Sequence, residues 1–354
     1  MLKNKLKSRP LILLFLLLQL SGQSYADELK QRIILLGDAG YSKLSPLEPS
    51  LQLAADIAKE EPNKTKVLFL GDNIYTRGYP VLKGGKTDFN KKQLKQISFL
   101  TAQLQVAKLS GSQLYLLPGN HDWIARQVDD QADYIKSYAQ SEQLNAALVP
   151  YQQGKKPLPE IVHLPGISLL FIDSTWWLRK SGKNVDKVNK QVEKLLVQQR
   201  ADYPNNVIML ASHHPIKSVG PHGSFGKVAE CIEDKSCTHK KVGEIAHPVA
   251  QKAIKSLTNI LAGYEKVIYA AGHDHSLQVF EFDNDGQQQV ALVSGAANHN
   301  KISPVGETQD NIFALSDIGF MVLDIYQKDI SQNKVQLKVY TAEKGQVVFE
   351  KVLF

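Results

Sequence analysis

Short apolar runs that alternate with helix-like stretches constrain the fold of this chain more than any other feature. Six runs rich in β-branched and other apolar residues each end at a Gly-rich or polar cluster: 33–36, 67–70, 114–117, 169–172, 207–210 and 267–270. Such runs are typical of buried strands. Apolar residues near helical spacing predict helices at 51–59, 92–108, 188–199 and 249–261. Because strand and helix alternate, the sequence predicts an α/β layered fold.

After residue 275 the pattern changes to strands with little helix, at 290–293, 320–324, 335–340 and 346–349. We expect these late strands to form a second sheet packed on the first. The sequence has no internal repeat and no Pro/Gly/Ser-rich linker, so we expect one catalytic domain over residues 27–354. Residues 76–90 and 218–241 are predicted to be long loops, and long loops beside strand ends often carry function.

The first 26 residues have the pattern of a bacterial-type secretory signal. Four basic residues precede an apolar run at 11–20, and a small-x-small pattern ends at Ala26. A membrane anchor is the alternative, but this run is well short of the ~20 residues that a spanning helix needs. We therefore expect cleavage after Ala26, a periplasmic or secreted protein, and no membrane anchor in the mature chain. Cleavage removes four positive charges from the formal +7 and leaves +3.

Composition narrows the classes of partner. Hydrophobic residues make up 43% of the 354 residues, which is enough for a large core. No stripe of Lys and Arg with interleaved aromatic residues is present, so nucleic acid is not an expected partner. Cys231 and Cys237 lie in the expected exported part, where they could form a local disulfide or remain two unpaired thiols. The sequence indicates no particular oligomeric state, and we find no role for the 231–241 insertion.

Five polar clusters follow the predicted strands. They are Gly-Asp-Ala-Gly at 37–40, Gly-Asp-Asn-Ile-Tyr at 71–75, Gly-Asn-His-Asp at 119–122, Ser-His-His-Pro at 212–215 and Gly-His-Asp-His at 272–275. The carboxyl ends of strands in open α/β sheets converge on one crevice. A single such cluster is usually turn chemistry. Taken together, these carboxylates and imidazoles are the side chains that bind hard to borderline metal ions, so the joint pattern predicts a metal site.

The clusters resemble, in order, the five motifs of the calcineurin-like metallophosphoesterases. Tyr75 stands three residues after Asp72, and this tyrosine narrows the resemblance to the purple acid phosphatase branch, in which it is a metal ligand. The ordered motifs cover about residues 33–297. The resemblance implies two packed mixed β-sheets flanked by helices, the αββα sandwich of this superfamily.

The resemblance also implies a ligand set for two metal ions. One ion would be held by Asp38, Asp72, Tyr75 and His275, and the other by Asp72, Asn120, His213 and His273. Asp72 would then bridge the two ions. His213 is favoured over His214 because the ligand of the family stands two residues before a proline, as His213 does before Pro215.

The residue types indicate which ions and which chemistry are expected. Two cations about 3.5 to 4 Å apart can each hold a phosphate oxygen, and a metal-bound hydroxide can attack phosphorus in line. The unperturbed pKa of a phenol is ~10, so Tyr75 as an anionic ligand calls for a strong Lewis acid. Fe(III) paired with a divalent Fe, Zn or Mn ion meets this requirement. A trivalent ion also predicts activity in mildly acidic solution.

Two histidines are candidates for the general acid that protonates the leaving group. His121 follows the predicted ligand Asn120, and the resemblance places it beside the substrate. His222 lies nine residues beyond His213 and matches a substrate-side histidine of the small purple phosphatases, although an ordinary loop histidine is an equal interpretation. Asp173, at the end of the 169–172 run, is expected to act in a turn or helix cap.

The function expected from these features is hydrolysis of small phosphate monoesters by an acid phosphatase. A phosphodiesterase or nucleotidase that uses the same metals is the alternative within enzymes. A binding or scaffold protein with a dead site is a third hypothesis. Dead sites usually lack ligands, and none of the seven predicted ligands is missing here.

Overall fold

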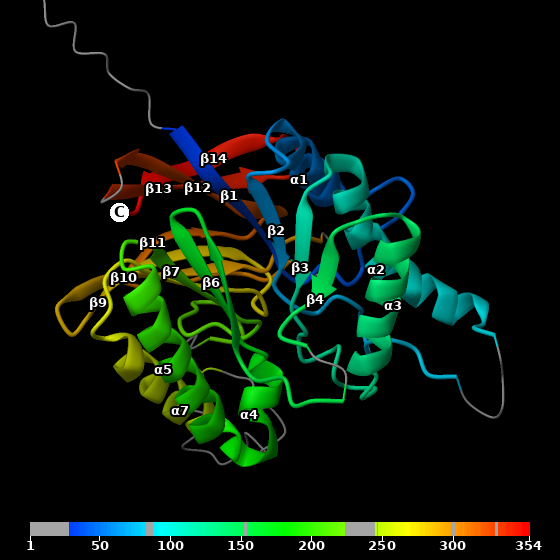
Figure 1. The fold of residues 1–354 in the computed structure, drawn as a ribbon. Helices are drawn as coiled ribbons and strands as arrows, with labels where there is room; N and C mark the ends of the chain where they lie inside the picture. The colour runs from blue at the N-terminus through cyan, green and yellow to red at the C-terminus, as the bar shows by residue number, and fades with distance from the viewer. Residues whose placement is uncertain are drawn as a thin grey trace, which may run out of the picture.

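The computed structural model describes residues 28–82, 88–151, 154–223, 245, 247–298, 300, 302–306, 308–329 and 332–354. The expected signal segment and both cysteines lie outside these ranges. Two seven-stranded sheets are packed face to face, with helices on their outer faces (Figure 1). This is the predicted sandwich of two mixed sheets flanked by helices. No helix in the described ranges is long and apolar enough to span a membrane.

The first sheet combines strands from both ends of the chain. Its order is β14 (Gln346–Val352), β13 (Gln332–Thr341), β12 (Gly319–Asp329), β1 (Glu28–Leu36), β2 (Thr65–Phe69), β3 (Gln113–Leu116) and β4 (Ala146–Leu148). Strands β1 to β4 run parallel to one another, whereas β12 pairs antiparallel with β1 and continues into the antiparallel β13 and β14. The parallel half brings three of the five polar clusters to one edge.

The second sheet has the same mixed character. Its order is β11 (Asn311–Leu315), β9 (Leu277–Asn284), β10 (Gln287–Ser294), β8 (Val267–Ala271), β7 (Val207–Ala211), β6 (Ile167–Phe171) and β5 (Glu160–Leu164). Strands β6, β7, β8 and β10 are parallel, and β5, β9 and β11 are the antiparallel additions. The other two clusters follow β7 and β8.

Alternation along β1 shows how the layers form. Ile33 and Leu35 point into the core between the sheets, where they meet residues such as Met209 of β7. Ile34 and Leu36 point the other way, into the core beneath the helices. This period of two is expected for a strand that is buried on both faces.

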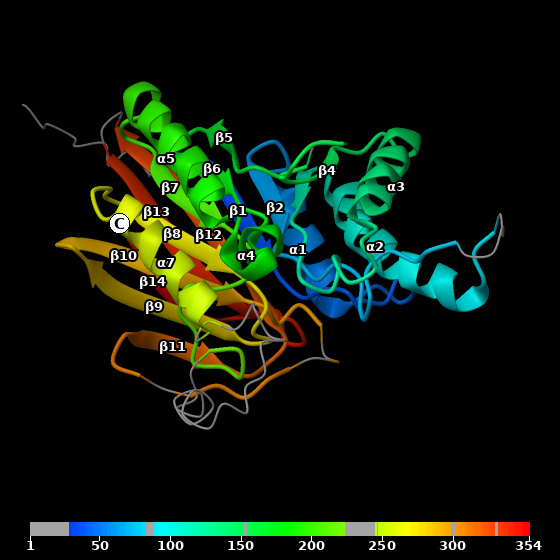
Figure 2. The ribbon, with the colours of Figure 1, turned by 90° about the horizontal axis from the view of Figure 1, so that it is seen from below.

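Each sheet carries its own helices (Figure 2). The first is covered by α1 (Pro49–Glu60), α2 (Lys91–Ser110) and α3 (Val128–Ser141), and the second by α4 (Ser174–Gly182), α5 (Val185–Asp202) and α7 (Pro248–Leu261). Local sequence sets their ends: Asn90 and Gln93 form a capping box at the start of α2, and Gly111 ends that helix in the left-handed conformation. Proline occupies the first turn of α1 and of α7.

The strand and helix runs predicted from the sequence are all present, but the division into sheets differs from the expectation. The late strands do not form a sheet of their own, since β12, β13 and β14 extend the first sheet while β9, β10 and β11 complete the second. The early strands are likewise shared, with β1 to β3 in one sheet and β6 to β8 in the other. Helices α3 and α4 are additional elements.

Candidate metal centre

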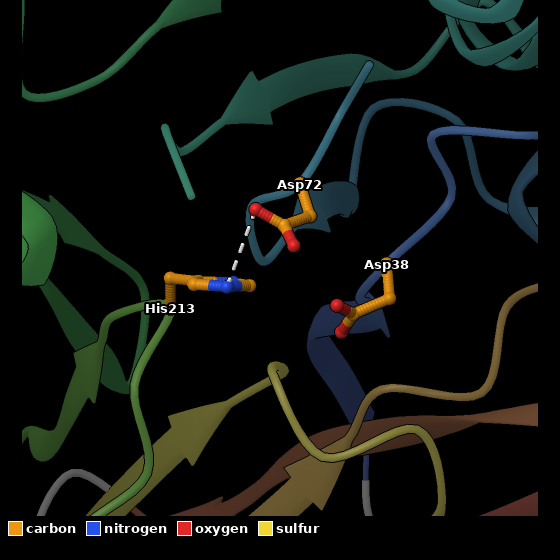
Figure 3. A group of neighbouring side chains, drawn as sticks. All are labelled: Asp38, Asp72 and His213. Carbon is orange, nitrogen blue, oxygen red and sulfur yellow. Dashed lines mark ion pairs between the residues drawn. The ribbon is translucent and has the colours of Figure 1, made fainter. Parts of the chain in front are cut away.

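The predicted ligands meet where the carboxyl ends of the two parallel regions face each other. Asp38 follows β1, Asp72 follows β2, His213 follows β7, and His273 follows β8. Figure 3 shows the side chains of Asp38, Asp72 and His213 directed into one space. One ligand atom from each of these three lies within 4.8 Å of the other two. The site is therefore shared between the sheets.

The first group of donors centres on Asp38. The Tyr75 hydroxyl donates to Asp38 Oδ1 at 2.7 Å, and the same carboxylate oxygen is 3.4 Å from His275 Nε2. Tyr75 Oη and His275 Nε2 are 3.1 Å apart. Asp38 and Tyr75 are both at least 99% buried. These are the three residues that the resemblance assigned, with Asp72, to one ion.

The second group centres on His213. Its Nε2 is 3.4 Å from Asp72 Oδ1, 2.9 Å from Asn120 Oδ1 and 3.2 Å from His273 Nδ1. Asp72 also lies close enough to Tyr75 for its charge and a hydrogen bond to raise the pKa of that phenol. Asp72 therefore contacts both groups, which is the position that a bridging ligand requires.

Backbone conformation at three of these residues is unusual. Asp38, Asp72 and His273 have φ of 61°, 53° and 70°, in the left-handed region that favours glycine. Such residues persist only where the surrounding structure holds them, and they cluster at functional sites. Here the backbone N–H of His273 donates to Asp38 Oδ2 at 2.7 Å, and that of His121 donates to Asp72 Oδ1 at 2.8 Å.

Glycines allow these turns to approach the site. Gly71 has φ of 93°, and a Cβ at this position would lie 2.5 Å from His213 Nδ1. A Cβ on Gly119 would collide with the Asp72 carboxylate. These two glycines of the predicted clusters are thus required by the close packing of one ligand against the next turn.

Electrostatics divides the site into anionic and neutral donors. Burial raises the pKa of Asp38, but the hydrogen bond and charge of His275 and the charge of His213 bring it below its ordinary value. Burial, followed by the charges of Asp38 and Asp72, raises the pKa of Tyr75 well above 10. Burial and neighbouring imidazoles lower the pKa of His273 well below 6.5. His273 is therefore neutral, the form in which imidazole binds metals.

The donor set fits metal ions. Two buried carboxylates within one cluster are costly unless cations compensate them. His273 Nε2 is fully buried and has no hydrogen-bond partner, so this lone pair or N–H is otherwise unsatisfied. Carboxylate, imidazole, amide and phenol donors together suit a transition metal better than Ca²⁺ or Mg²⁺. Asp38, Tyr75 and His275 would hold one ion, and Asn120, His213 and His273 the other, with Asp72 between them.

Both candidate acids lie beside this centre. The His121 side chain is 28% exposed, its ring is 4.7 Å from the Tyr75 ring, and its Nε2 is 3.9 Å from Asp72 Oδ2. The His222 ring is 4.3 Å from that of His273 and 6.1 Å from that of His275. The structure therefore places His222, which is nine residues after His213 in sequence, beside the candidate site.

Asp173 has the capping role that the sequence predicted. Its Oδ1 accepts the backbone N–H of Trp176 at 2.9 Å in the first turn of α4. Its Oδ2 also accepts the indole N–H of Trp123 at 2.9 Å, which links the loop after β3 to α4.

Sequence reasoning assigned no role to two buried residues that hold the loops of the site. Asp122 accepts the backbone N–H groups of Gly119, Asn73 and Ile74 at 2.8, 3.1 and 3.2 Å. Ser174 Oγ accepts the N–H groups of His213 and His214 at 3.2 and 2.9 Å. The position of Asp122 three residues after Gly119 was the available signal, since Asp in such clusters commonly bonds nearby backbone. No local pattern marks Ser174, whose partners lie about 40 residues away in sequence.

Known proteins with similar sequences and folds agree with this geometry. The sequence model of the calcineurin-like phosphoesterase family matches residues 31–277. Tartrate-resistant acid phosphatase type 5 of Rattus norvegicus is 24% identical over 348 residues, which cover 91% of each chain. The purple acid phosphatase PPD1 of yellow lupin (Lupinus luteus) has a TM-score of 0.60 at 16% identity, over 91% of this chain and 53% of that one.

A further structural neighbour is GAP50, the anchor in the inner membrane complex of Plasmodium, with a TM-score of 0.51 at 17% identity. The similarity covers 92% of this chain and 89% of GAP50. At such identities the neighbours establish the fold alone, whereas the family match extends over more than half of the chain. The chain therefore belongs to the calcineurin-like phosphoesterase family, and its relatives support the resemblance to the purple acid phosphatase branch.

Proposed function

We propose that this protein is an acid phosphatase that hydrolyses small phosphate monoesters at a centre of two metal ions. The observation that carries the proposal is the arrangement of two donor groups around Asp72, one containing a phenol and the other an amide and two imidazoles. Bound ions would supply Lewis-acid stabilisation of the phosphate oxygens and a water acidic enough to attack phosphorus. Fe(III) with a divalent Fe, Zn or Mn ion is the proposed pair.

The phenol supports the choice of iron. Burial and two carboxylates hold the pKa of Tyr75 well above its ordinary value, so the free hydroxyl stays protonated and donates to Asp38. Only a strongly polarising ion compensates the cost of the phenolate in this surrounding. The proposed acidic working range follows from the same ion, because a trivalent cation keeps bound water acidic.

The residues of the chain divide the remaining work. His121 and His222 lie on the rim, where a protonated imidazole can give its proton to the leaving oxygen as the P–O bond breaks. The His121 ring is oriented by the Thr76 carbonyl oxygen, which contacts Nδ1 and leaves Nε2 toward the centre. Neutral His273 and the Asn120 amide add no charge, so the site stays attractive to a phosphate dianion.

The decisive experiment joins metal analysis to a substrate panel. Purified mature protein is analysed for iron, zinc and manganese, and kcat/KM is measured for nitrophenyl phosphate, an alkyl phosphate, bis(nitrophenyl) phosphate and a nucleotide. We expect two metal equivalents and a preference for monoesters. Higher kcat/KM for the diester would move the function to a phosphodiesterase. Protein that is metal-free and inactive after addition of each ion would support a scaffold function.

Histidine variants test the proposed acids. His121→Ala and His222→Ala should retain both metals and slow alkyl phosphate hydrolysis by about 10²- to 10⁴-fold, the usual contribution of general acid catalysis. Nitrophenyl phosphate should be affected less because its leaving group needs little protonation. His163→Ala is the matched control, since this histidine stacks on Tyr203 and pairs with Ser168 near the start of β6, away from the carboxyl ends of the strands where the donors gather. Equal slowing of both substrates would instead assign a histidine to phosphate binding.

A further inference from the structure

The segment that carries His222 is held in place from one side by two buried residues. Residues 218–223, here called the 218–223 segment, leave the loop after β7 and pass beside the turn between β8 and β9. Asp274 and Gln278 of that turn and strand are both 0% exposed. Neither residue belongs to the predicted ligand set, so their polar groups require another account.

Asp274 contacts both ends of the segment. One carboxylate oxygen accepts the Ser218 hydroxyl, and the other accepts the backbone N–H of His222 at 3.1 Å. A Cβ on Gly220 would collide with the same carboxylate. The segment therefore wraps closely around the Asp274 side chain, and the absence of a side chain at Gly220 allows this approach.

Gln278 holds the middle of the segment. Its Oε1 accepts the backbone N–H of Val219 at 2.8 Å, and its Nε2 donates to Ser218 Oγ at 3.1 Å. The Gly220 N–H donates to Ser218 Oγ at 3.0 Å. Ser218 Oγ thus gives one hydrogen bond to Asp274 and receives two, which uses the full capacity of a hydroxyl.

The position of Asp274 in the chain connects this network to the metal centre. Asp274 lies between the predicted ligands His273 and His275, and its backbone is fixed by bonds to Gly272 O at 2.9 Å and from Ser276 N at 2.8 Å. The same turn therefore carries two predicted metal ligands and also presents a carboxylate to the 218–223 segment. A displacement of the segment relative to the predicted ligands would require its hydrogen bonds to Asp274 to break or this turn to move.

We propose that Asp274, assisted by Ser218 and Gln278, is a positioning residue that fixes the His222 imidazole over the metal centre for transfer of its proton to the leaving alcohol. This inference rests on the proposed phosphatase function. The Asp274 carboxylate is bonded to Ser218 and to the backbone N–H of His222, and it would act through this N–H. The resulting 4.3 Å spacing between the His222 and His273 rings places the acid beside the site of P–O cleavage.

Asp274→Asn is the test because it preserves size and replaces one acceptor oxygen with an NH₂ donor, which faces either the Ser218 hydroxyl or the His222 N–H. A misplacement of about 1 Å can cost roughly 10²-fold in rate. We expect kcat/KM for an alkyl phosphate to fall by about 10- to 100-fold, with a smaller loss for nitrophenyl phosphate and two metals retained. Asp283→Asn, at an exposed position of β9, is the matched control.

The double variant that combines Asp274→Asn with His222→Ala tests whether Asp274 acts through His222. If Asp274 acts through His222, Asp274→Asn should have little further effect on alkyl phosphate hydrolysis in the His222→Ala protein. Ser218→Ala removes the bridging hydroxyl without changing a residue adjacent in sequence to a predicted ligand. It should change the ratio of alkyl to aryl phosphate hydrolysis rates in the same direction as Asp274→Asn. Multiplicative losses in the double variant, or equal losses on both substrates, would overturn the proposal.

Hydrogen exchange provides a readout that does not depend on activity. The N–H groups of Val219, Gly220 and His222 all donate to the network, so exchange in a peptide covering 218–223 should accelerate in Asp274→Asn while peptides from β1 and β2 stay unchanged. Unchanged exchange in this peptide would overturn the proposal. Wild-type protein that hydrolyses no phosphate ester would contradict the proposed function, whereas an active enzyme with an unaltered alkyl-to-aryl ratio in Asp274→Asn contradicts only this inference.

Discussion

Replacement of Asp122 by alanine tests how the two loops that supply Asp72 and Asn120 are held together. The Asp122 side chain is fully buried and accepts four hydrogen bonds, three of them from backbone N–H groups and one from the Asn73 amide at 3.1 Å. Each bond contributes ~1 kcal/mol and the lost packing a further ~1 kcal/mol. Where the wild-type Asp122 side chain is protonated, Asp122→Ala should therefore lower the free energy of unfolding by about 5 kcal/mol.

The cost should depend on pH. Burial and the charge of Asp72 raise the pKa of Asp122 from 3.8 to about 7 in the metal-free protein. Because the folded pKa lies above the unfolded value, the stabilisation is complete below pH ~4 and is lost as pH rises through about 7. The raised pKa therefore cancels about 2 kcal/mol of the stabilisation by Asp122 at pH 5 and about 4 kcal/mol of it at pH 8. The net destabilisation should be roughly 3 kcal/mol at pH 5 and about 1 kcal/mol at pH 8.

Urea denaturation of chelator-treated wild type and Asp122→Ala at both pH values measures these free energies of unfolding. Asp122→Asn is the control, because it keeps one acceptor oxygen but cannot ionise. The difference between wild type and Asp122→Asn should therefore fall with rising pH in the same way. A destabilisation below about 1 kcal/mol at pH 5, or one that is equal at both pH values, would refute the reasoning.

Three other predictions concern the centre and its surroundings, and one concerns export. Asp72→Ala should lose both metals and essentially all turnover, because the two cations would repel across the gap; two bound metals at a normal rate would relocate the bridge. Tyr75→Phe should lose a visible phenolate-to-iron band while keeping part of the metal, as absorption spectra with metal analysis would show. Burial and the charge of His213 lower the pKa of His214 well below 6.5, so the metal-free fold should lose up to ~1.4 kcal/mol of stability per pH unit below ~6.5. The difference in free energy of unfolding between wild type and His214→Gln should therefore narrow from pH 7 to pH 5. N-terminal sequencing of fractionated cells should find exported protein that starts near Asp27, and an intact Met1 on cytosolic protein would contradict the signal.

The candidate donor residues could be predicted from the sequence because their signal is local. Each cluster follows an apolar run, and the ends of parallel strands are where such side chains collect. The resemblance supplied the further step from five clusters to two ligand groups, and the structure brings together the members of each group. Two sets of contacts bear on that assignment. In one, Asp38 lies beside Tyr75 and His275, and in the other, His213 lies beside Asn120 and His273.

Two features of the site were beyond local patterns. Ser174 and Asp274 hold loops that are 39 to 56 residues away along the chain. A serine at the start of a helix and an aspartate between two histidines have many ordinary explanations, and the partner that selects among them is set by packing. The pKa of Asp122 likewise depends on how deeply it is buried beside Asp72.

The sequence by itself determined the α/β layered class, most of the strands and helices, and a candidate set of metal ligands, because backbone periodicity and side-chain chemistry are properties of neighbouring residues. Only the tertiary structure decided which strands share a sheet. In it, β12 pairs with β1 across nearly the whole chain, and β10 pairs with β8, so late strands complete both sheets. Pairing between distant segments depends on which burial and hydrogen bonding the complete chain can satisfy together, and no local pattern records that choice.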